Sequence, residues 1–314
     1  MGRKDFDQKA YLSEPRRYAD LYNAAFFEGK QFLKAEEMEL TESVTAHVGS
    51  DGTVEKISDI VMRQKRTGEL FALWILENQE TMDYSMPVRV MLKEAMEYEK
   101  QVKRLRSDNS RQSEKKLSAG EFLYKVKKSD HICPVVTLIL YWGKQKWDGP
   151  RSLHDFIDFS AMDETEKEKI KKFVPEYPLH ILDLNVKDDY KEFSTELRTV
   201  FELYARRNNK ERFREYIANN EECRHLDSET VQFIGRITKS AELLQGGIGM
   251  KEEEDVDMCR AITEMIEEGR TEGRAEGRTE LILKMLKKGI SCEEVSDIAE
   301  VSIEQIKVLE ASLR

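Results

Sequence analysis

Two neighbouring segments of strand-forming residues constrain the fold of this 314-residue chain more than any other feature. The first is 56–63, KISDIVMR, and the second is the apolar run 70–76, LFALWIL, which ends in Glu77-Asn78-Gln79. Side chains alternate between the two faces of a strand, so Glu77 and Gln79 share one face at the end of a strand expected to be buried. A buried carboxylate is costly without a partner or a metal. Asp59, Glu77 and Gln79 therefore make a candidate site.

The elements around this pair of strands predict an α/β core. Helical spacing, turn residues and β-branched runs indicate a helix, a meander of three strands, a second helix and a strand parallel to the meander's last one. In chain order these are 16–30, 40–48, 56–63, 70–79, 87–105 and 132–143. Asp51-Gly52 is expected to turn the first strand into the second. Pro87 belongs in the first turn of its helix, where a missing N–H costs nothing.

The rest of the chain is predicted to be mostly helical. Residues 106–119 have the composition of a loop, and a short strand is expected at 179–184. Helices are expected near 163–173 and at 189–207, 209–219 and 227–244. We therefore divide the chain into a core at 1–186, a helical extension at 187–246 and an acidic helical tail with a short helical end module at 247–314.

The tail contains a repeat with a period of four, Glu-Gly-Arg-Thr/Ala, over residues 268–279. On a helix its glycines would form one narrow stripe, which could let two helices approach closely in a homodimer. Glycine also costs a helix roughly 1 kcal/mol per residue, which favours a polar linker instead. Ser291-x-x-Glu294 and Ser302-x-x-Gln305 are capping boxes, and each is expected to open a short helix.

Charge is distributed unevenly along a chain whose net charge is −10. Residues 100–128 carry ten Lys or Arg against three Asp or Glu, while 249–314 carry ten against seventeen. The basic segment could hold phosphates, or it could be a solvated helix end and loop. The four cysteines and five histidines are scattered without zinc or disulfide spacing. No run approaches the ~20 apolar residues of a membrane span, so we expect a cytoplasmic protein with no membrane partner.

The candidate site suits a hard cation. Asp59 and Glu77 on neighbouring strands could hold Mg²⁺, which prefers oxygen ligands and polarises phosphates. Gln79 cannot act as a general base, because an amide takes up no proton at neutral pH, but it could orient a water. The alternative is an ordinary strand end, with the two acids in hydrogen bonds or ion pairs.

Several blocks of this sequence resemble the Rpn family of recombination-promoting nucleases and putative transposases, in the PD-(D/E)XK nuclease superfamily. The resemblance covers most of the chain. It is carried by RYADLYN at 17–23, the Asp59 strand, LENQET at 76–81, YSMPVRVM at 84–91, and the Glu-Gly-Arg repeat ahead of LKKGIS at 286–291. It implies a restriction-endonuclease-like core, a mixed central sheet flanked by helices, followed by a helical C-terminal region.

The resemblance also implies an activity and assigns the site. It implies an Mg²⁺-dependent DNA endonuclease, with Mn²⁺ as a substitute, that promotes recombination or transposition in a bacterial-type, nucleoid-associated setting. Asp59 and Glu77 would bind the metal, and Gln79 stands where the superfamily usually has lysine. The alternative is a nuclease-fold DNA-binding or assembly protein with little or no cleavage.

Cationic residues outside this motif are expected to contact DNA phosphates. Arg89 is a candidate phosphate contact, with an ion pair to Glu77 or Glu80 as the alternative. In the basic segment the candidates are Lys115, Lys116, Lys125 and Lys127. No organic cofactor is expected.

Overall fold

The computed structural model describes residues 3–41, 45–48, 54–57, 60–111, 117–238, 277–299 and 301–311. The strands are β1 (Met38–Thr41), β2 (Thr45–Val48), β3 (Val54–Ile57), β4 (Ile60–Arg66), β5 (Glu69–Gln79), β6 (Val135–Tyr141) and β7 (His180–Asp183). The helices of the core are α1 (Arg3–Leu12), α2 (Pro15–Phe27), α3 (Met86–Arg111), α4 (Ala119–Tyr124), α5 (Leu153–Phe156) and α6 (Glu164–Lys171). They are followed by α7 (Leu197–Arg206), α8 (Lys210–Asn219), α9 (Ser228–Thr238), α12 (Cys292–Ala299) and α13 (Ile303–Ala311). Two short 3-10 helices lie at Ala35–Glu37 and Glu221–Arg224.

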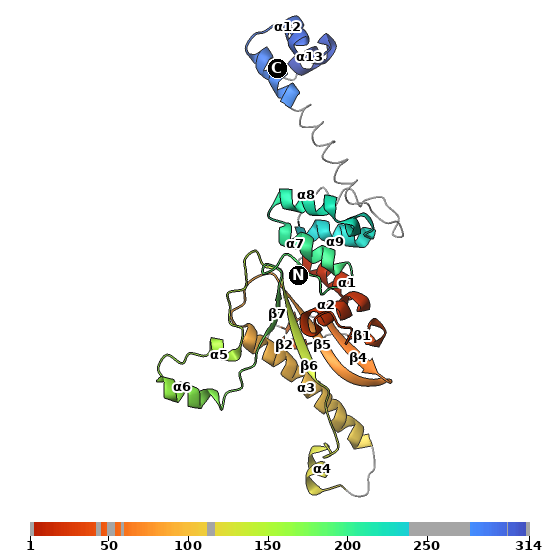
Figure 1. Ribbon diagram of the computed structural model, residues 1–314, viewed down its shortest axis with the longest axis vertical. Helices are drawn as coiled ribbons and strands as arrows, with labels where there is room; N and C mark the ends of the chain where they lie inside the picture. The colour runs from red at the N-terminus through yellow and green to blue at the C-terminus, as the bar shows by residue number, and fades with distance from the viewer. Residues whose placement is uncertain are drawn as a thin grey trace.

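A five-stranded mixed sheet in the order β1-β4-β5-β6-β7 forms the centre of the molecule (Figure 1). The first three strands are antiparallel, while β5, β6 and β7 are parallel. Thr67 and Gly68 both have positive φ, 52° and 84°, as the tight turn of a right-twisted hairpin between β4 and β5 requires. Helix α3 makes the crossover from β5 to β6. The expected mixed α/β fold with flanking helices is confirmed, and it is compatible with a restriction-endonuclease-like core.

The meander differs from the expectation at its first strands. The single strand expected at 40–48 is two strands, and β1 pairs directly with β4. In a separate two-stranded sheet, β2 pairs with β3, with Val48 opposite Val54. Asp51-Gly52 and Asp59 lie outside the described residues. The two pairings share one antiparallel register, with Thr41 opposite Val61 and Thr45 opposite Ile57. The expected pairing of 40–48 with the next strand is therefore confirmed, and only the division into shorter strands differs from the expectation.

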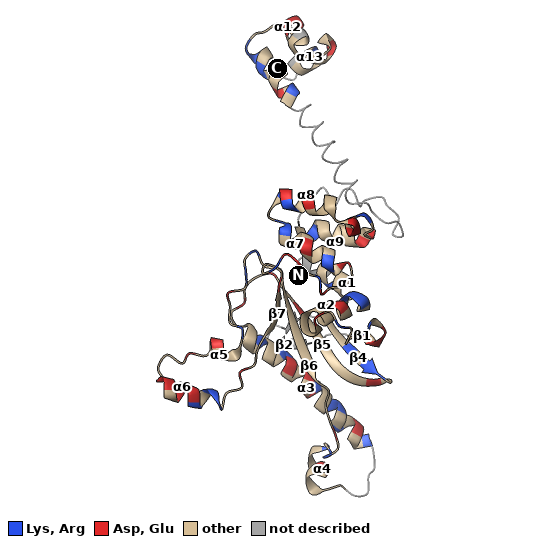
Figure 2. Ribbon diagram, in the orientation of Figure 1, with Lys and Arg blue, Asp and Glu red and all other residues tan. Residues whose placement is uncertain are grey.

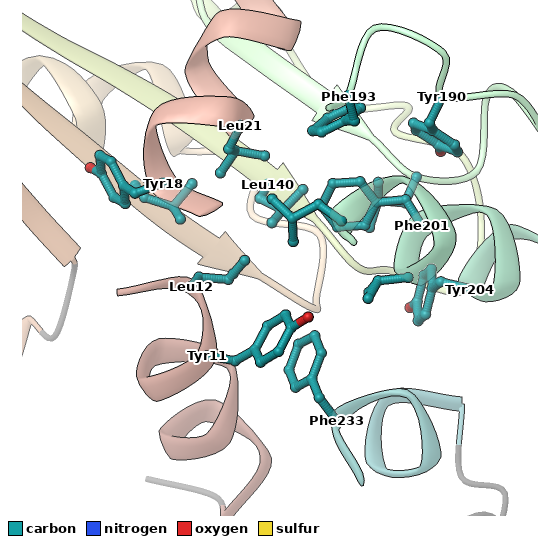
Figure 3. Packing of buried hydrophobic residues seen from close by; sticks show 14 of the residues in the cluster. Tyr11, Leu12, Tyr18, Leu21, Leu140, Tyr190, Phe193, Phe201, Tyr204 and Phe233 are labelled. Carbon is teal, nitrogen blue, oxygen red and sulfur yellow. The ribbon is translucent and has the colours of Figure 1, made fainter. Parts of the chain in front are cut away.

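One face of the sheet is covered by α2, with α1, α7 and α9 around it. The core cluster on this face joins Trp74 and Leu140 of the sheet to residues as distant in sequence as Leu12 and Phe201 (Figure 3). Tyr11 of α1 stacks on Phe233 of α9, with 4.0 Å between ring centroids. The helices after residue 186 thus share a hydrophobic core with the first helices of the chain.

Helix α3 covers the opposite face. Its buried residues are Met86, Pro87, Val90 and Lys93, all in the first two turns. The helix then continues to Arg111, so the loop expected at 106–119 begins later than its composition indicated. Figure 1 shows why the second half buries less: α3 runs past the edge of the sheet towards α4.

The described C-terminal residues pack on themselves. Residues 277–287 are helical, and Ile282 from this helix packs with Val295 of α12 and Ile306 of α13. Gly289 has a φ of 82°, which suits the end of the helix before it. The capping box at Ser291 is present, since Ser291 and Glu294 bond each other's backbone N–H groups. Among the described residues no helix is long and apolar enough to cross a membrane.

Candidate functional site

Glu77 lies near the carboxyl end of β5, where its Cα pairs with that of Ile139 on β6. Alternation places Glu77 on the same face as Leu73 and Ile75, which pack in the small core cluster on the α3 side. Its side chain is only 2% exposed. A carboxylate buried to this degree requires positive partners.

Two cations one turn apart on α3 supply them. Arg89 donates to Glu77 Oε1, and Lys93 donates to Glu77 Oε2. The Lys93 side chain is 3% exposed, whereas that of Arg89 is 37% exposed. Glu77 and Lys93 therefore form a buried ion pair, and Arg89 connects that pair to the surface.

Asp83 completes the cluster from the turn before α3. Its Oδ2 accepts from Arg89 Nη1 at 3.1 Å, and its Oδ1 accepts from the backbone and hydroxyl of Ser85. Burial raises the pKa of Asp83, but the hydrogen bonds from Ser85 and Arg89 outweigh it, so this pKa lies below its usual range. With Asp83 and Glu77 negative and Arg89 and Lys93 positive, the four groups are neutral as a set.

Gln79 points to the same face as Glu77 but takes no part in this cluster. Its Nε2 donates to the carbonyl of Thr81 at 2.6 Å, and the side chain is half-buried. Two residues along a strand span about 7 Å. The amide is thus near enough to Glu77 to orient a small ligand between them.

The other candidates fall into two groups. Asp59, Lys115 and Lys116 lie outside the described residues. Lys125 and Lys127 are described, but far from Glu77. They follow α4, where Asn109 near the end of α3 donates to the Lys125 carbonyl at 3.0 Å. The helix from Lys93 to Asn109 spans about 24 Å at 1.5 Å per residue, so these lysines do not join the Glu77 cluster.

Lys93 is the residue that the sequence interpretation missed. The apolar residues of α3 do not all mark its inward face, since Val88 and Leu92 are exposed. The face that is buried begins with Met86, Val90 and Lys93, at spacings of four and three. On a helical wheel in which Val90 faces the sheet, Lys93 lies on the same face.

The fit of a divalent metal depends on Glu77 and its surroundings. Among the described residues no group of three or more His, Cys, Asp or Glu is placed to hold a metal ion. Each carboxylate oxygen has two lone pairs, so Glu77 could ligate a metal while it accepts from Lys93 and Arg89. Thr137 lies opposite Ile75 on β6, and its buried hydroxyl has no hydrogen-bond partner among the described residues. Glu77 is thus one possible metal ligand, and a divalent ion would need further oxygen ligands beyond the described residues of this cluster.

Comparison with known proteins gives one family. The family model described as "Putative transposase, YhgA-like" matches residues 30–229, nearly two-thirds of the chain. The matched region contains the whole five-stranded sheet and the helices from α3 to the start of α9, while α1 and α2 precede it. No curated protein and no solved structure gives a significant match.

Proposed function

Because this chain belongs to the YhgA-like family of putative transposases, we propose that it is a metal-dependent DNA endonuclease that hydrolyses phosphodiester bonds and promotes recombination or transposition. The observation that carries the proposal is Glu77, a carboxylate buried at the end of a central strand and flanked by Lys93 and Arg89. This set of charges can bind a metal ion and a phosphate side by side.

Glu77 and Asp59 would hold the metal. The last described pair between β4 and β5 is Ile60 with Leu76, the residues directly after Asp59 and directly before Glu77 in the chain. When bound, Mg²⁺ would polarise the phosphate and lower the pKa of an attacking water.

The charges of the cluster make metal binding depend on DNA. Without a metal, the Glu77 carboxylate already faces two cations, and a divalent ion would be repelled by both. A DNA phosphate would offer Arg89 and Lys93 another anion and would itself ligate the metal. We therefore expect the metal to bind the free protein weakly and the protein–DNA complex more tightly.

Lys93 takes the role of the lysine that Gln79 replaces. Its ammonium reaches Glu77 from α3 rather than from β5. There it can stabilise the negative charge that develops on the phosphate in the transition state. Gln79 can hold the attacking water in place but cannot deprotonate it.

Arg89 has the exposure expected of a phosphate ligand. Its guanidinium bridges Glu77 and Asp83, and more than a third of the side chain faces solvent. A phosphate could replace one of these carboxylates with a bidentate pair. The ion pairs would then hold Arg89 in position before DNA arrives.

Nicking of supercoiled plasmid tests the proposal. The wild-type chain is expected to nick DNA with Mg²⁺ or Mn²⁺ and not with EDTA, while Asp59→Asn and Glu77→Gln lower the rate by at least about 100-fold. Cleavage that persists in both variants would contradict the site. Equal cleavage with EDTA would contradict the metal.

Glu77→Gln needs a control for folding, because it leaves Lys93 buried without its counter-charge. Breaking such a pair costs about 3–5 kcal/mol, whereas replacing both partners by neutral groups costs little. Glu77→Gln combined with Lys93→Met should therefore unfold at a urea concentration near that of the wild type and remain inactive. A stable double variant that still nicks DNA would remove Glu77 and Lys93 from the mechanism.

The basic segment at 100–128 is proposed to bind the DNA backbone away from the cut. Replacing Lys115, Lys116, Lys125 and Lys127 by Gln should weaken DNA binding and flatten its dependence on salt. The matched control replaces Lys167, Lys169, Lys171 and Lys172 of the α6 region. An unchanged salt slope in the first variant would exclude the segment.

A second function, DNA binding without cleavage, is favoured by one observation. Both oxygens of Glu77 already accept from cations, an arrangement that would also stabilise a site that binds no metal. DNA binding with no nicking under any metal condition would support this function over the first.

A further inference from the structure

Helix α4 presents three consecutive large apolar side chains to solvent. Phe122, Leu123 and Tyr124 are 64%, 69% and 64% exposed. Isolated exposed apolar residues are ordinary, but three adjacent ones on a single turn of helix are characteristic of a contact surface. We call these three residues the α4 tip.

The α4 tip is held in place by polar contacts rather than by a core. Ser118 and Glu121 form a capping box at the start of α4. At its end, the side chain of Asn109 on α3 donates to the Lys125 carbonyl and to Asp130 Oδ2, at 3.0 and 2.7 Å. Asp130 also accepts from the Lys127 backbone at 2.7 Å. The tip is thus fixed to the end of α3 with its apolar residues facing outward.

Positive charge surrounds the tip. Lys103, Arg106 and Arg111 are exposed on the outer half of α3, and Lys128 is exposed after α4. Figure 2 shows blue bands, with red ones between them, along α3 toward an α4 that is mostly uncharged. Lys125 Nζ lies 4.0 Å from the centre of the Phe122 ring. An aromatic residue among cations is the composition of surfaces that bind single-stranded nucleic acid, where rings stack on bases and cations hold the backbone.

We propose that the α4 tip binds unpaired bases of DNA, with Phe122 and Tyr124 stacking on them and the surrounding cations contacting the phosphates. The inference rests on the proposed function, and it specifies the substrate class as duplex DNA with an adjoining single-stranded segment. The duplex would lie along α3 toward Glu77, and the unpaired bases would lie at α4. A second copy of the chain is a poorer occupant, because two such basic surfaces repel each other.

Binding measured with EDTA tests the tip without cleavage. The probes are a labelled single strand, its full duplex, and a partial duplex with a single-stranded end, each titrated with the full chain. Phe122→Ala with Tyr124→Ala should weaken binding to the single strand and the partial duplex by about tenfold or more. Binding to the full duplex should stay unchanged, and Phe122→Trp with Tyr124→Trp should retain the wild-type preference.

Phe173→Ala is the matched control, since Phe173 is an 83% exposed aromatic residue outside the basic segment. It should change none of the three affinities. Equal losses for all three probes in the alanine variant, or no loss, would overturn the inference and leave the proposed function intact. A wild-type chain that binds no DNA at all would overturn both.

Two further measurements address other occupants of the tip. Sedimentation of the wild type and the alanine variant should give the same oligomeric state. Vesicles that contain anionic lipid should bind both chains equally. A self-association or vesicle affinity that disappears in the alanine variant, while its DNA affinities are unchanged, would overturn the inference.

Discussion

Two clusters of buried charge lie on opposite faces of the sheet, and their partners differ in kind. Asp20 on α2 accepts from the backbone N–H and hydroxyl groups of Ser194 and Thr195, just before α7. Glu77 on β5 accepts from two long side chains, those of Arg89 and Lys93. Short donors fixed by the backbone cannot turn to another ligand, whereas long side chains can.

The Asp20 cluster is therefore structural. Arg17, one turn before Asp20, pairs with Glu196 at 2.6 Å and Glu229 at 2.8 Å. Asn23 bonds the backbone of Leu33 through both its oxygen and its nitrogen. The block at 17–23, which lies before the region that the family model matches, thus ties α2 to segments that precede β1 and enter α7 and α9. In the Glu77 cluster, by contrast, Arg89 is held by two carboxylates and 37% of its side chain is exposed.

Outside the Glu77 cluster, the largest expected effect is on stability, at Asp20. Asp20→Ala leaves two hydroxyls and two backbone N–H groups of the 194–195 turn without their acceptor, which should lower the free energy of unfolding by about 3 kcal/mol. Urea denaturation measures this value. Cleavage per folded molecule should not change.

Glu39→Ala is the control for Asp20→Ala. Glu39 on β1 pairs with Lys65 at 2.7 Å, and both side chains are largely exposed. Its loss should cost less than about 1 kcal/mol. If Asp20→Ala lowers the free energy of unfolding no more than Glu39→Ala does, the backbone-fixed donors around Asp20 stabilise the fold no more than an exposed ion pair does.

Lys93→Met should have the next largest effect, on catalysis. Loss of the ammonium should lower the single-turnover cleavage rate by about 100-fold, which corresponds to about 2.7 kcal/mol of transition-state stabilisation. The comparison is Lys100→Met, seven residues further along α3 on the same side of the helix, where Lys100 pairs with Glu97. Equal rates for the two variants would assign Lys93 a structural role like that of Arg17.

Local patterns predicted most of the fold correctly. The apolar run into Glu77, Pro87 in the first turn of its helix, and the β-branched strand of β6 each agree with the structure. The pairing of 40–48 with the next strand was also predicted, but its division into β1 and β2 was not, because an alternating pattern does not mark where a strand is interrupted. The length of α3 was missed because polar residues at 106–111 form a helix that extends beyond the sheet, where no apolar face is needed.

The burial of Glu77 and its pairing with Arg89 could be anticipated from the sequence, but its pairing with Lys93 could not. Burial of Glu77 followed from the strand that precedes it, since the run 70–76 is apolar without a break. Lys93 lies sixteen residues further on, and the helix face that contains it has few apolar residues to mark it. Its pairing with Glu77 depends on how α3 crosses β5, which local sequence does not encode.

The smallest expected effect concerns Asp83, which holds Arg89 on its solvent side. The pKa of Asp83 is lower in the folded chain than its unfolded value of about 3.9, so its charge stabilises the fold above that pH. This contribution should disappear as the pH falls through the folded pKa. In urea titrations Asp83→Asn should therefore be less stable than the wild type at neutral pH, by less than about 1 kcal/mol because the group is partly exposed.

The difference between the two chains should be constant from neutral pH down to about pH 5 and should vanish in stronger acid. A difference that grows toward acid would have the wrong sign for a carboxylate that is more acidic when folded. Asp83→Asn also leaves Arg89 with Glu77 alone, so phosphate should compete for Arg89 more easily. If Asp83→Asn binds duplex DNA with unchanged affinity, Arg89 does not turn from its carboxylate partners to a phosphate. The Glu77 cluster would then be as rigid as the Asp20 cluster.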